Sequence, residues 1–419
     1  MIRAASRLVA GTVLVLVNSA TASAQAPAVA APAPPTPLQA GFQDGFFIQT
    51  TTGDYRLLFG FVAQEDGRFV VDDPQHAVTD TFTIRKIRPT WSGRIARYFD
   101  FKVMPDFGNG TAVVQDAYFD VRFSPKFRLR AGKDKTPIGL ELLQGDAYLL
   151  FPERALASSL VPNRDVGVQV QGDIGGNYLF YAAGLFNGIP DGSSSTTEVD
   201  TNNGKDAAGR VVFTPWRTAT AQQSKLKRLG FAVGGSTGHQ LGALPSFKTS
   251  VQQTYFSYSA ATADGTRRRI SPSVFYYNKS YGGFAEYMRS SQWVAKGAVR
   301  RYITNSAWEV TGSVVVTGEA ASDRGVRPKN TFDPAEGHWG ALQLLARYTQ
   351  LTIDPQAFQA GFAAAAASRE ARSFTAAANW YPNPYIKFYA TYERTTFDRG
   401  APGARHPENA VLFRSQLGF

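Results

Sequence analysis

Apolar and polar residues alternate in stretch after stretch of this chain, as far as the last residue, Phe419. Clear cases are residues 99–104, 113–123 and 386–393, which are rich in aromatic and β-branched side chains and are bounded by Gly, Asn, Pro or Asp. A period of two places successive side chains on opposite faces of a β-strand. The sequence therefore predicts an all-β fold whose strands have one apolar and one polar face.

The connections between these stretches alternate as well. Long polar connections are expected at 67–78, 108–111, 135–163, 188–203, 238–265, 292–304, 354–370 and 397–408, and tight turns near 95–96, 124–125, 175–176, 280–281 and 382–384. Two further segments in tight-turn positions, 216–227 and 320–336, are longer. These fifteen connections join sixteen strands, and long loops opposite short turns are typical of outer-membrane barrels. We therefore expect a 16-stranded antiparallel transmembrane β-barrel.

The two ends of such a barrel must pair with each other. Residues 409–419 alternate to the end, with Phe413, Leu417 and Phe419 on one parity and Arg414 and Gln416 on the other. Closure would pair this strand with the first one, near 55–66, so that neither keeps a free edge. The terminal aromatic resembles the signal that is read by the outer-membrane insertion machinery. The stretch 251–260 could be a seventeenth strand, but bacterial barrels close with even numbers, so we assign it to a loop.

The start of the chain has the pattern of a secretory signal. Arg3 and Arg7 precede an apolar run from Leu8 to Val17, and an A-x-A site ends at Ala24. The run is too short to span a bilayer as a membrane anchor, the alternative interpretation. We expect a signal peptide at 1–24, an Ala/Pro-rich linker at 25–52 and a barrel domain at 53–419. The competing fold, a secreted array of β-sandwiches, does not predict the signal, the terminal Phe and the loop rhythm together.

Several chemistries have no support in the sequence. The chain has no cysteine and only four histidines, and none of these has a second histidine at metal-ligand spacing. Phosphate-loop and nucleophile-elbow patterns are missing as well, so we expect no enzyme, cofactor or metal. A barrel lipase or protease would need a nucleophile beside a histidine, and an adhesin would display loops without conducting. The formal net charge of +11 suits an anionic solute, since secretion argues against nucleic acid.

Charges on the strands should face water in the lumen, because Lys or Arg facing lipid costs about 2–4 kcal/mol at mid-membrane. The basic path expected in the lumen comprises Lys102, Arg122, Arg128, Arg130, Lys133 and Lys135. An adjacent pair, Arg85 and Lys86, presents a difficulty, because strand neighbours point to opposite faces. A bulge would have to turn one of them, or a neighbouring protomer would have to cover it. Rings of basic residues are how pores favour anions.

Two further segments bear on the pore. Arg267, Arg268 and Arg269 lie where a loop joins a strand, and with Lys248 they would form an extracellular funnel for anions or else a rim that contacts lipopolysaccharide. The 135–163 connection is long and contains Leu149, Leu150 and Phe151, which would not stay exposed. We expect this connection to fold inward as a constriction loop.

These residues resemble the phosphate-selective porin O and P family over nearly the whole mature chain. The strongest segments are 127–133 with 137–141, then 153–154 and 164–169, and the ending carries Lys387 and a terminal Phe. The resemblance implies an outer-membrane homotrimer of 16-stranded barrels with a basic pathway for phosphate. It further implies that Arg85, Lys86 and Lys387 line the constriction. Phe61 and Leu142 depart from the family pattern, since basic residues are expected at both places.

The sequence thus leads to an outer-membrane porin for passive diffusion of small anions. Phosphate or phosphorylated compounds are the first solutes to consider. The alternative is a general or sugar-type porin, in which carboxylates such as Asp100, Asp116 and Glu393 oppose the basic residues across the lumen. In that case the positive charge would carry no marked selectivity.

Overall fold

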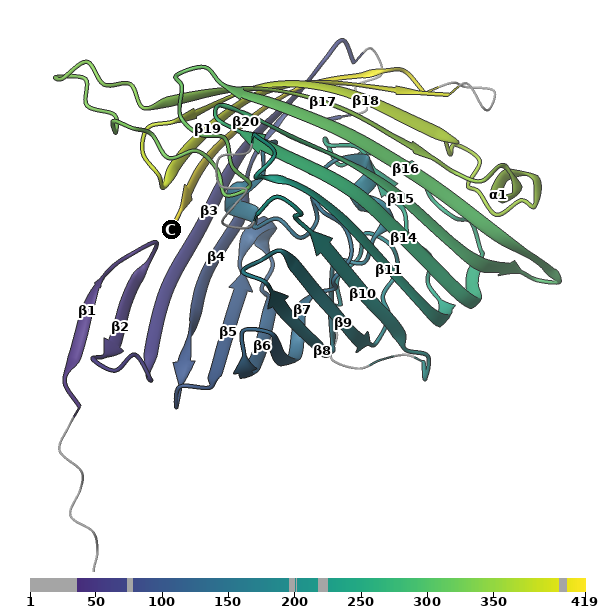
Figure 1. Cartoon of the computed structure of the whole chain (residues 1–419). Coiled ribbons are helices and arrows are strands. Elements are labelled where there is room, and N and C mark those ends of the chain that lie inside the picture. The colour runs from purple at the N-terminus through teal and green to yellow at the C-terminus, as the bar shows by residue number, and fades with distance from the viewer. Residues whose placement is uncertain (1–35, 74–77, 196–199, 201, 218–224, 399–404) are drawn as a thin grey trace, which may run out of the picture. The chain divides into compact units, whose positions relative to one another are not determined.

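The computed structural model describes residues 36–73, 78–195, 200, 202–217, 225–398 and 405–419. The predicted signal peptide and the first part of the predicted linker lie outside these residues, so the predicted domain boundaries stay predictions. Residues Leu38–Phe419 form one unit built around a closed antiparallel barrel (Figure 1). No helix within the described part of the chain is long and apolar enough to cross a membrane.

The barrel has sixteen strands, as predicted, and each one pairs with its neighbours around a ring. The strands are β3 (Arg56–Val71), β4 (Thr81–Ile95), β5 (Phe99–Asp106), β6 (Val113–Ser124), β7 (Phe127–Lys135), β8 (Arg164–Ile174), β9 (Leu179–Phe186), β10 (Asp206–Phe213), β11 (Leu229–Gly242), β14 (Thr262–Asn278), β15 (Tyr281–Lys296), β16 (Val299–Val315), β17 (Ala341–Thr352), β18 (Glu370–Tyr381), β19 (Ile386–Phe397) and β20 (Glu408–Gly418).

The last strand closes the ring against the first, as the sequence predicts. β20 pairs with β3 from Asn409 opposite Val71 to Gly418 opposite Val62. The final residue continues the ladder, because Phe419 and Phe61 exchange backbone hydrogen bonds of 2.8 and 3.0 Å. The Phe419 ring also lies within 6.4 Å of the rings of Phe42, Phe46 and Phe59. Pairing and aromatic contacts together hold the chain end in place.

The two ends of the barrel differ as expected. We call the end that carries the chain's C-terminus the turn end and the opposite one the loop end. One correction concerns the expected long loop at 292–304. β15 and β16 run through it and are joined by residues 297–298 alone, because Cα pairing continues as far as Lys296 and Val299. The stretch 251–260 lies in a loop, where β13 (Thr254–Phe256) pairs with β12 (Phe247–Lys248).

A small hairpin adjoins the barrel at the turn end. β1 (Leu38–Phe42) pairs with β2 (Phe46–Thr50), which in turn pairs with residues 56–59 of β3. These strands lie within the segment that was expected to be a linker. The short helical turns are η1 (Gly108–Gly110), η2 (Asp146–Tyr148), η3 (Leu156–Leu160) and α1 (Pro355–Gln359).

Alternation sorts the side chains into an outer and an inner set. Phe388, Tyr392 and Phe413 are exposed on the outside, whereas Lys387, Glu393 and Arg414 are almost fully buried inside. The main apolar cluster also lies inside. Ile138, Leu156 and Leu160 of the 136–163 loop pack there against Met288 and Leu351 of the wall. The loop therefore folds into the lumen, as predicted, and crosses to the opposite wall.

Candidate functional site

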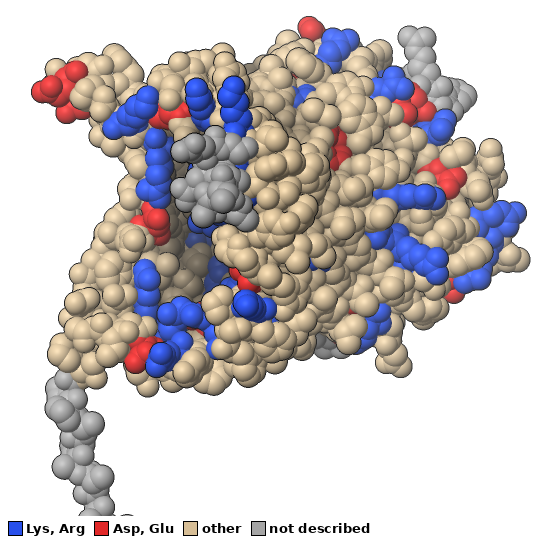
Figure 2. All heavy atoms as spheres, viewed as in Figure 1, with Lys and Arg blue, Asp and Glu red and all other residues tan. Residues whose placement is uncertain are grey.

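The 136–163 loop, which we call the constriction loop, is bordered by two cavities. The lower cavity, of about 340 Å³, reaches the turn end at Tyr385 and Phe419 and runs along β4 to β8. The upper cavity, of about 430 Å³, lies at the loop end between the constriction loop and residues 244–252. Figure 2 shows basic side chains, in blue, around the hollow at the turn end. A solute crossing the barrel would meet these two spaces.

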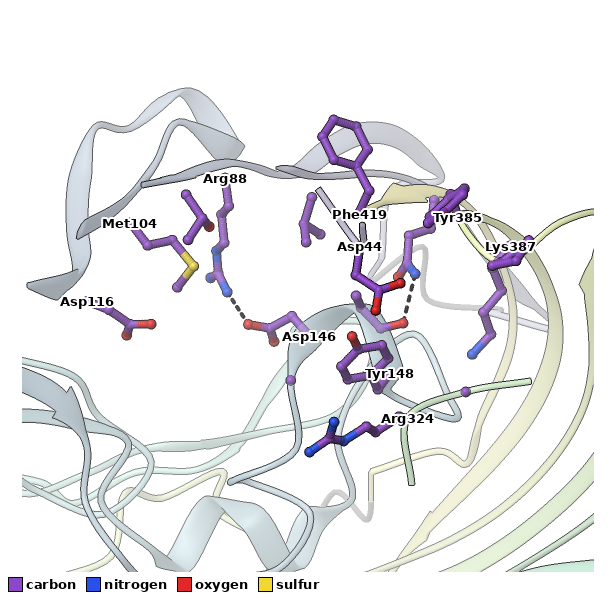
Figure 3. A pocket seen from close by; sticks show the side chains of 18 of the residues that line it. Asp44, Arg88, Met104, Asp116, Asp146, Tyr148, Arg324, Tyr385, Lys387 and Phe419 are labelled. Carbon is purple, nitrogen blue, oxygen red and sulfur yellow. Dashed lines mark hydrogen bonds and ion pairs between the residues drawn. The ribbon is translucent and has the colours of Figure 1, made fainter. Parts of the chain in front are cut away.

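The lower cavity carries an excess of positive charge. Its basic side chains are Arg88, Lys102, Lys135, Arg164, Arg324, Arg327 and Lys387, and its acidic ones are Asp44, Asp116, Asp134 and Asp146. Even with the terminal carboxylate of Phe419, seven cations outnumber the anions. Figure 3 shows Arg88 pointing to Asp146. Lys387 and Arg324 lie on the same side of the cavity as Tyr148, away from Arg88 (Figure 3).

The difficulty of the adjacent pair Arg85 and Lys86 is resolved by a bulge. On β3, Gln64 pairs with Lys86 but the next residue pairs with Ile84, so Arg85 is an extra residue in β4. A bulge re-aims side chains locally. Both cations consequently reach the constriction loop: Arg85 Nε lies 2.8 Å from Glu153 Oε1, and Lys86 Nζ lies 2.7 Å from Asp146 Oδ1.

Asp146 is the centre of the largest charge cluster. It accepts hydrogen bonds from Lys86, Arg88 and Arg154, and Arg164 lies 3.7 Å away. Burial alone would raise the pKa of the Asp146 carboxyl, but the surrounding cations hold it well below its usual range. Burial likewise raises the pKa of Glu153, but Arg85, Arg414 and Arg68 together lower it by more, so that it lies below its usual range. Both loop carboxylates are therefore ionised at neutral pH and hold the constriction loop against β4.

Lys387 differs from the other predicted constriction residues. Its ammonium donates to the backbone oxygen of Leu149 at 2.7 Å and lies 4.0 Å from the ring centre of Tyr389. Among the described residues it has no carboxylate within ion-pair distance. An ammonium has three donors. Lys387 therefore keeps hydrogen-bond donors beside the lower cavity that no carboxylate of the described chain occupies.

The predicted basic path is only partly assembled at the cavities. Lys102 and Lys135 line the lower cavity. Lys102 pairs with Asp116 at 2.7 Å, and Lys135 donates to backbone oxygens of the constriction loop. The other residues of this path lie along the wall, where Arg122 pairs with Asp100, Arg128 with Asp173, and Arg130 with Asp120 and Asp134, while Lys133 donates to the backbone oxygens of Val114 and Ser195.

The predicted extracellular funnel has a different arrangement from the one expected. Arg267 and Arg269 lie within β14, buried in ion pairs with Asp206 and, for Arg269, with Asp191. Arg268, the residue between them, is exposed on the other parity. Only Lys248 of this group lines the upper cavity. The three arginines thus do not stand together at the rim.

Arg324 lines the lower cavity but was not among the residues predicted for the pore. It belongs to the connection 316–340 at the turn end. That connection is fixed by buried Val326 against Tyr381, and Arg327 bonds to Asp44 in the β1–β2 turn. The unusual length of a connection in a tight-turn position was the one signal that could have indicated it.

Carboxylates on the wall and loop were also overlooked. Glu286 on β15 accepts from the amides of Leu140 and Glu141 and so holds the start of the constriction loop. Within the described residues, no group of three or more His, Cys, Asp or Glu side chains is placed to hold a metal ion. Of the four histidines, His76 lies outside the described part of the chain.

Comparisons with known proteins agree with this architecture. A family model described as phosphate-selective porin O and P matches residues 60–419. The outer membrane channel DcaP of Acinetobacter baumannii is similar in structure, with a TM-score of 0.57, 12% identity and coverage of 91% of this chain and 100% of that one. The in-vitro folded trimer form of OmpT, an outer membrane protein of Vibrio cholerae, is also similar in structure. Its TM-score is 0.52 and its identity 12%, and the match covers 87% of this chain and 99% of that one.

A third solved structure is the anion-selective porin from Comamonas acidovorans, with a TM-score of 0.50, 10% identity and coverage of 87% of this chain and 99% of that one. No curated protein sequence matches the chain. At identities this low, the likeness to solved structures concerns the fold alone.

Proposed function

Since the chain belongs to the phosphate-selective porin O and P family and is a porin of the Gram-negative outer membrane, we propose that it passes small anions by passive diffusion. Phosphate or phosphorylated compounds are the first candidates, because the family description names phosphate. The family and the barrel indicate a channel rather than an enzyme. Outer-membrane barrels have short turns on the periplasmic side and long loops on the extracellular side, so the turn end would face the periplasm and the loop end the outside of the cell.

The observation that carries the proposal is the charge of the lower cavity. Seven basic side chains line it against four acidic ones, and Lys135, Arg324 and Lys387 have no carboxylate partner among the described residues. Fixed positive charge beside a narrow pore attracts anions and repels cations. Such a site must also bind weakly enough to release its ion. Lys135 and Lys387 suit this requirement, because each also donates hydrogen bonds to backbone oxygens of the protein.

A general or sugar-type porin is the second candidate, and a specific observation favours it. Most lumen cations are matched by a carboxylate at ion-pair distance, for example Arg88 by Asp146 and Asp106, and Arg414 by Asp66. The two family positions at which a basic residue was expected hold Phe61 and Leu142. Phosphate specificity is therefore less well supported than anion preference.

The deciding experiment measures ion selectivity in a planar bilayer. We expect a chloride-directed reversal potential across a KCl gradient, with saturable block of the chloride current by added phosphate. Arg85→Ala combined with Lys387→Ala should move the potential toward zero. Lys102→Gln should do so less, because Asp116 keeps Arg164 at 2.6 Å when Lys102 is lost. A cation-directed potential, or a double variant identical to wild type, would favour the general porin.

The assembly is proposed to be a homotrimer, in line with the family resemblance and the trimer form of the OmpT structure. The outer surface would contact lipid and lipopolysaccharide, and Phe419 would serve as the recognition signal for the insertion machinery. Arg268, exposed on the outer parity of β14, is placed for a lipopolysaccharide phosphate.

A further inference from the structure

Part of the wall of the upper cavity is polar and uncharged. Its hydroxyl and amide groups come from Ser159, Asn163 and Ser193 on one side and from Ser246, Ser250 and Gln252 on the other. In the described part of the chain, the side chains of Ser246, Ser250 and Gln252 have no hydrogen-bond partner. Hydroxyl and amide groups both donate and accept hydrogen bonds, as the hydroxyls of a polyol do.

The charges of the upper cavity are balanced and mostly engaged. Three basic side chains, Arg154, Lys248 and Arg347, stand against Glu153, Asp191 and Glu393. Glu153 is bound by Arg85, Asp191 by Arg269, and Glu393 by Arg347. A solute at the outer mouth therefore meets hydrogen-bonding groups before it meets net positive charge, which lies in the lower cavity.

The polar surface is fixed in place. The loop that carries Ser246 and Ser250 is held by Phe247 and Phe256, whose stacked rings are 5.7 Å apart, and both rings are fully buried. Further along, Val251 packs against Ala410 and Leu412 of β20. A preorganised set of donors and acceptors binds with less loss of entropy than a mobile one.

The cavities have room for more than a bare ion. Volumes of about 430 and 340 Å³ compare with about 30 Å³ for one water molecule in the liquid. They lie in the range of sites for small organic ligands, about 300–1,000 Å³. The sequence of surfaces along the pore, first hydroxyl-rich and then cationic, suits a solute that has both kinds of group.

We propose, on the basis of the anion-channel function above, that the preferred solutes are small organic anions with several hydroxyl groups, namely sugar acids or sugar phosphates. Their hydroxyls bind to the upper cavity at Ser246, Ser250 and Gln252 while the anionic group is drawn on toward the lower cavity. There Lys135, Arg324 and Lys387 receive it. Inorganic phosphate, which has no polyol portion, gains nothing from the upper cavity.

The test compares matched solutes as blockers of the chloride current, added at the loop end in a planar bilayer. Gluconate is set against acetate, and glucose 6-phosphate against inorganic phosphate, so that each pair shares its anionic group. We expect the hydroxylated member to block at a concentration about tenfold lower, since a few added hydrogen bonds change affinity by about that factor. The pair with the larger gain identifies carboxylate or phosphate as the preferred anionic group.

A variant ties the gain to this cavity. Ser246→Ala combined with Ser250→Ala should raise the blocking concentration of gluconate and glucose 6-phosphate and leave acetate and inorganic phosphate unchanged. Thr237→Ala, which removes a hydroxyl from the exposed outer face of β11, is the matched control and should change nothing. Reduction of block by all four anions in the serine variant would contradict the proposal.

The two proposals can fail separately. If gluconate blocks no better than acetate and glucose 6-phosphate no better than phosphate, while the reversal potential stays chloride-directed, the solute class is wrong and the anion channel stands. The same holds if the serine variant leaves the hydroxylated blockers unchanged. If the reversal potential is not chloride-directed, the anion channel itself is wrong.

Discussion

Single residues in the lumen show that most of its charge is balanced locally. Arg414, fully buried, binds Asp66 through two contacts of 2.6 and 2.8 Å. Burial of such a pair costs desolvation energy, which close and well-aligned contacts offset. Lys135, Arg324 and Lys387 are different, because no carboxylate lies within ion-pair distance of them in the described chain. A solute anion can therefore compete for them without displacing a protein carboxylate.

The depressed pKa of Asp146 predicts how the constriction loop responds to acid. An unfolded aspartate has a pKa of about 3.9, and in the folded protein the pKa of Asp146 lies well below its usual range. A lowered pKa adds stability above the unfolded value, and this is lost only as pH falls through the folded value. We therefore expect no change in single-channel conductance that depends on Asp146 between pH 7 and about pH 4.

The control for this prediction is Asp146→Asn, which removes the charge at every pH. It should leave Lys86 and Arg88 without their shared carboxylate on the loop and give noisier currents already at pH 7. A conductance change centred near pH 4 that disappears in the variant would show that Asp146 titrates in the ordinary range.

At the scale of elements, β4 shows what alternation can and cannot tell. The adjacent Arg85 and Lys86 violate period two, and this violation correctly indicated that a bulge or a covering protomer was needed. The bulge itself depends on how β4 pairs with Gln64 and Glu65 of β3. The register of a strand pair cannot be predicted from the sequence of either strand alone. For the same reason two ion-pair partners on neighbouring strands, Asp173 for Arg128 and Asp120 for Arg130, could not be foreseen.

Loop lengths were predictable only where polar composition marks the strand ends. Residues 292–304 contain Lys296, Gly297, Arg300 and Arg301, and this polar composition predicted a loop. In the structure β15 and β16 extend through these residues instead. The inward fold of the constriction loop was predictable because Leu149, Leu150 and Phe151 need burial. Its anchor Glu286 was not, because it lies 146 residues from Leu140 along the chain.

The hold of Glu286 on the constriction loop can be tested. Glu286→Leu removes the acceptor for the amides of Leu140 and Glu141, and an intramolecular hydrogen bond contributes about 0.5–1.5 kcal/mol. We expect a mobile loop, seen as frequent brief closures in single-channel records. Ser271→Ala is the control: Ser271 donates to Glu286 at 2.8 Å but does not touch the loop. Equal gating in both variants would contradict the anchoring role.

At the scale of the whole molecule, strand count, closure and the two unlike ends followed from repetition along the chain. Repetition averages over local errors, so the missing loop at 292–304 did not change the count of sixteen. The repeated pattern does not predict which loops contact other loops or the opposite wall of the barrel. Val251 from one loop reaches β20, and the 316–340 connection reaches the β1–β2 turn through Arg327 and Asp44. The shape of the pore depends on these contacts.

One outward residue does not suit a barrel surrounded entirely by lipid. Glu65 lies on β3 between Gln64 and Asp66, which are buried in the lumen, and its own side chain is exposed on the outer face. It lines a groove with small residues, among them Gly67, Ala378 and Ala390. A charge facing lipid is destabilising. In the proposed trimer, a closed ring of copies would cover this groove.

We therefore expect Glu65→Leu to weaken the trimer, because it removes a polar group from a contact between copies, although it would stabilise a lipid-facing surface. The measurement is the temperature at which purified trimers dissociate in mild detergent. Thr237→Leu is the matched control, because β11 lies eight strands from β3 around the ring and Thr237 is exposed on the outside. If Glu65→Leu trimers dissociate at the same or a higher temperature than wild type, the groove around Glu65 faces lipid and the contact between copies lies elsewhere on the barrel.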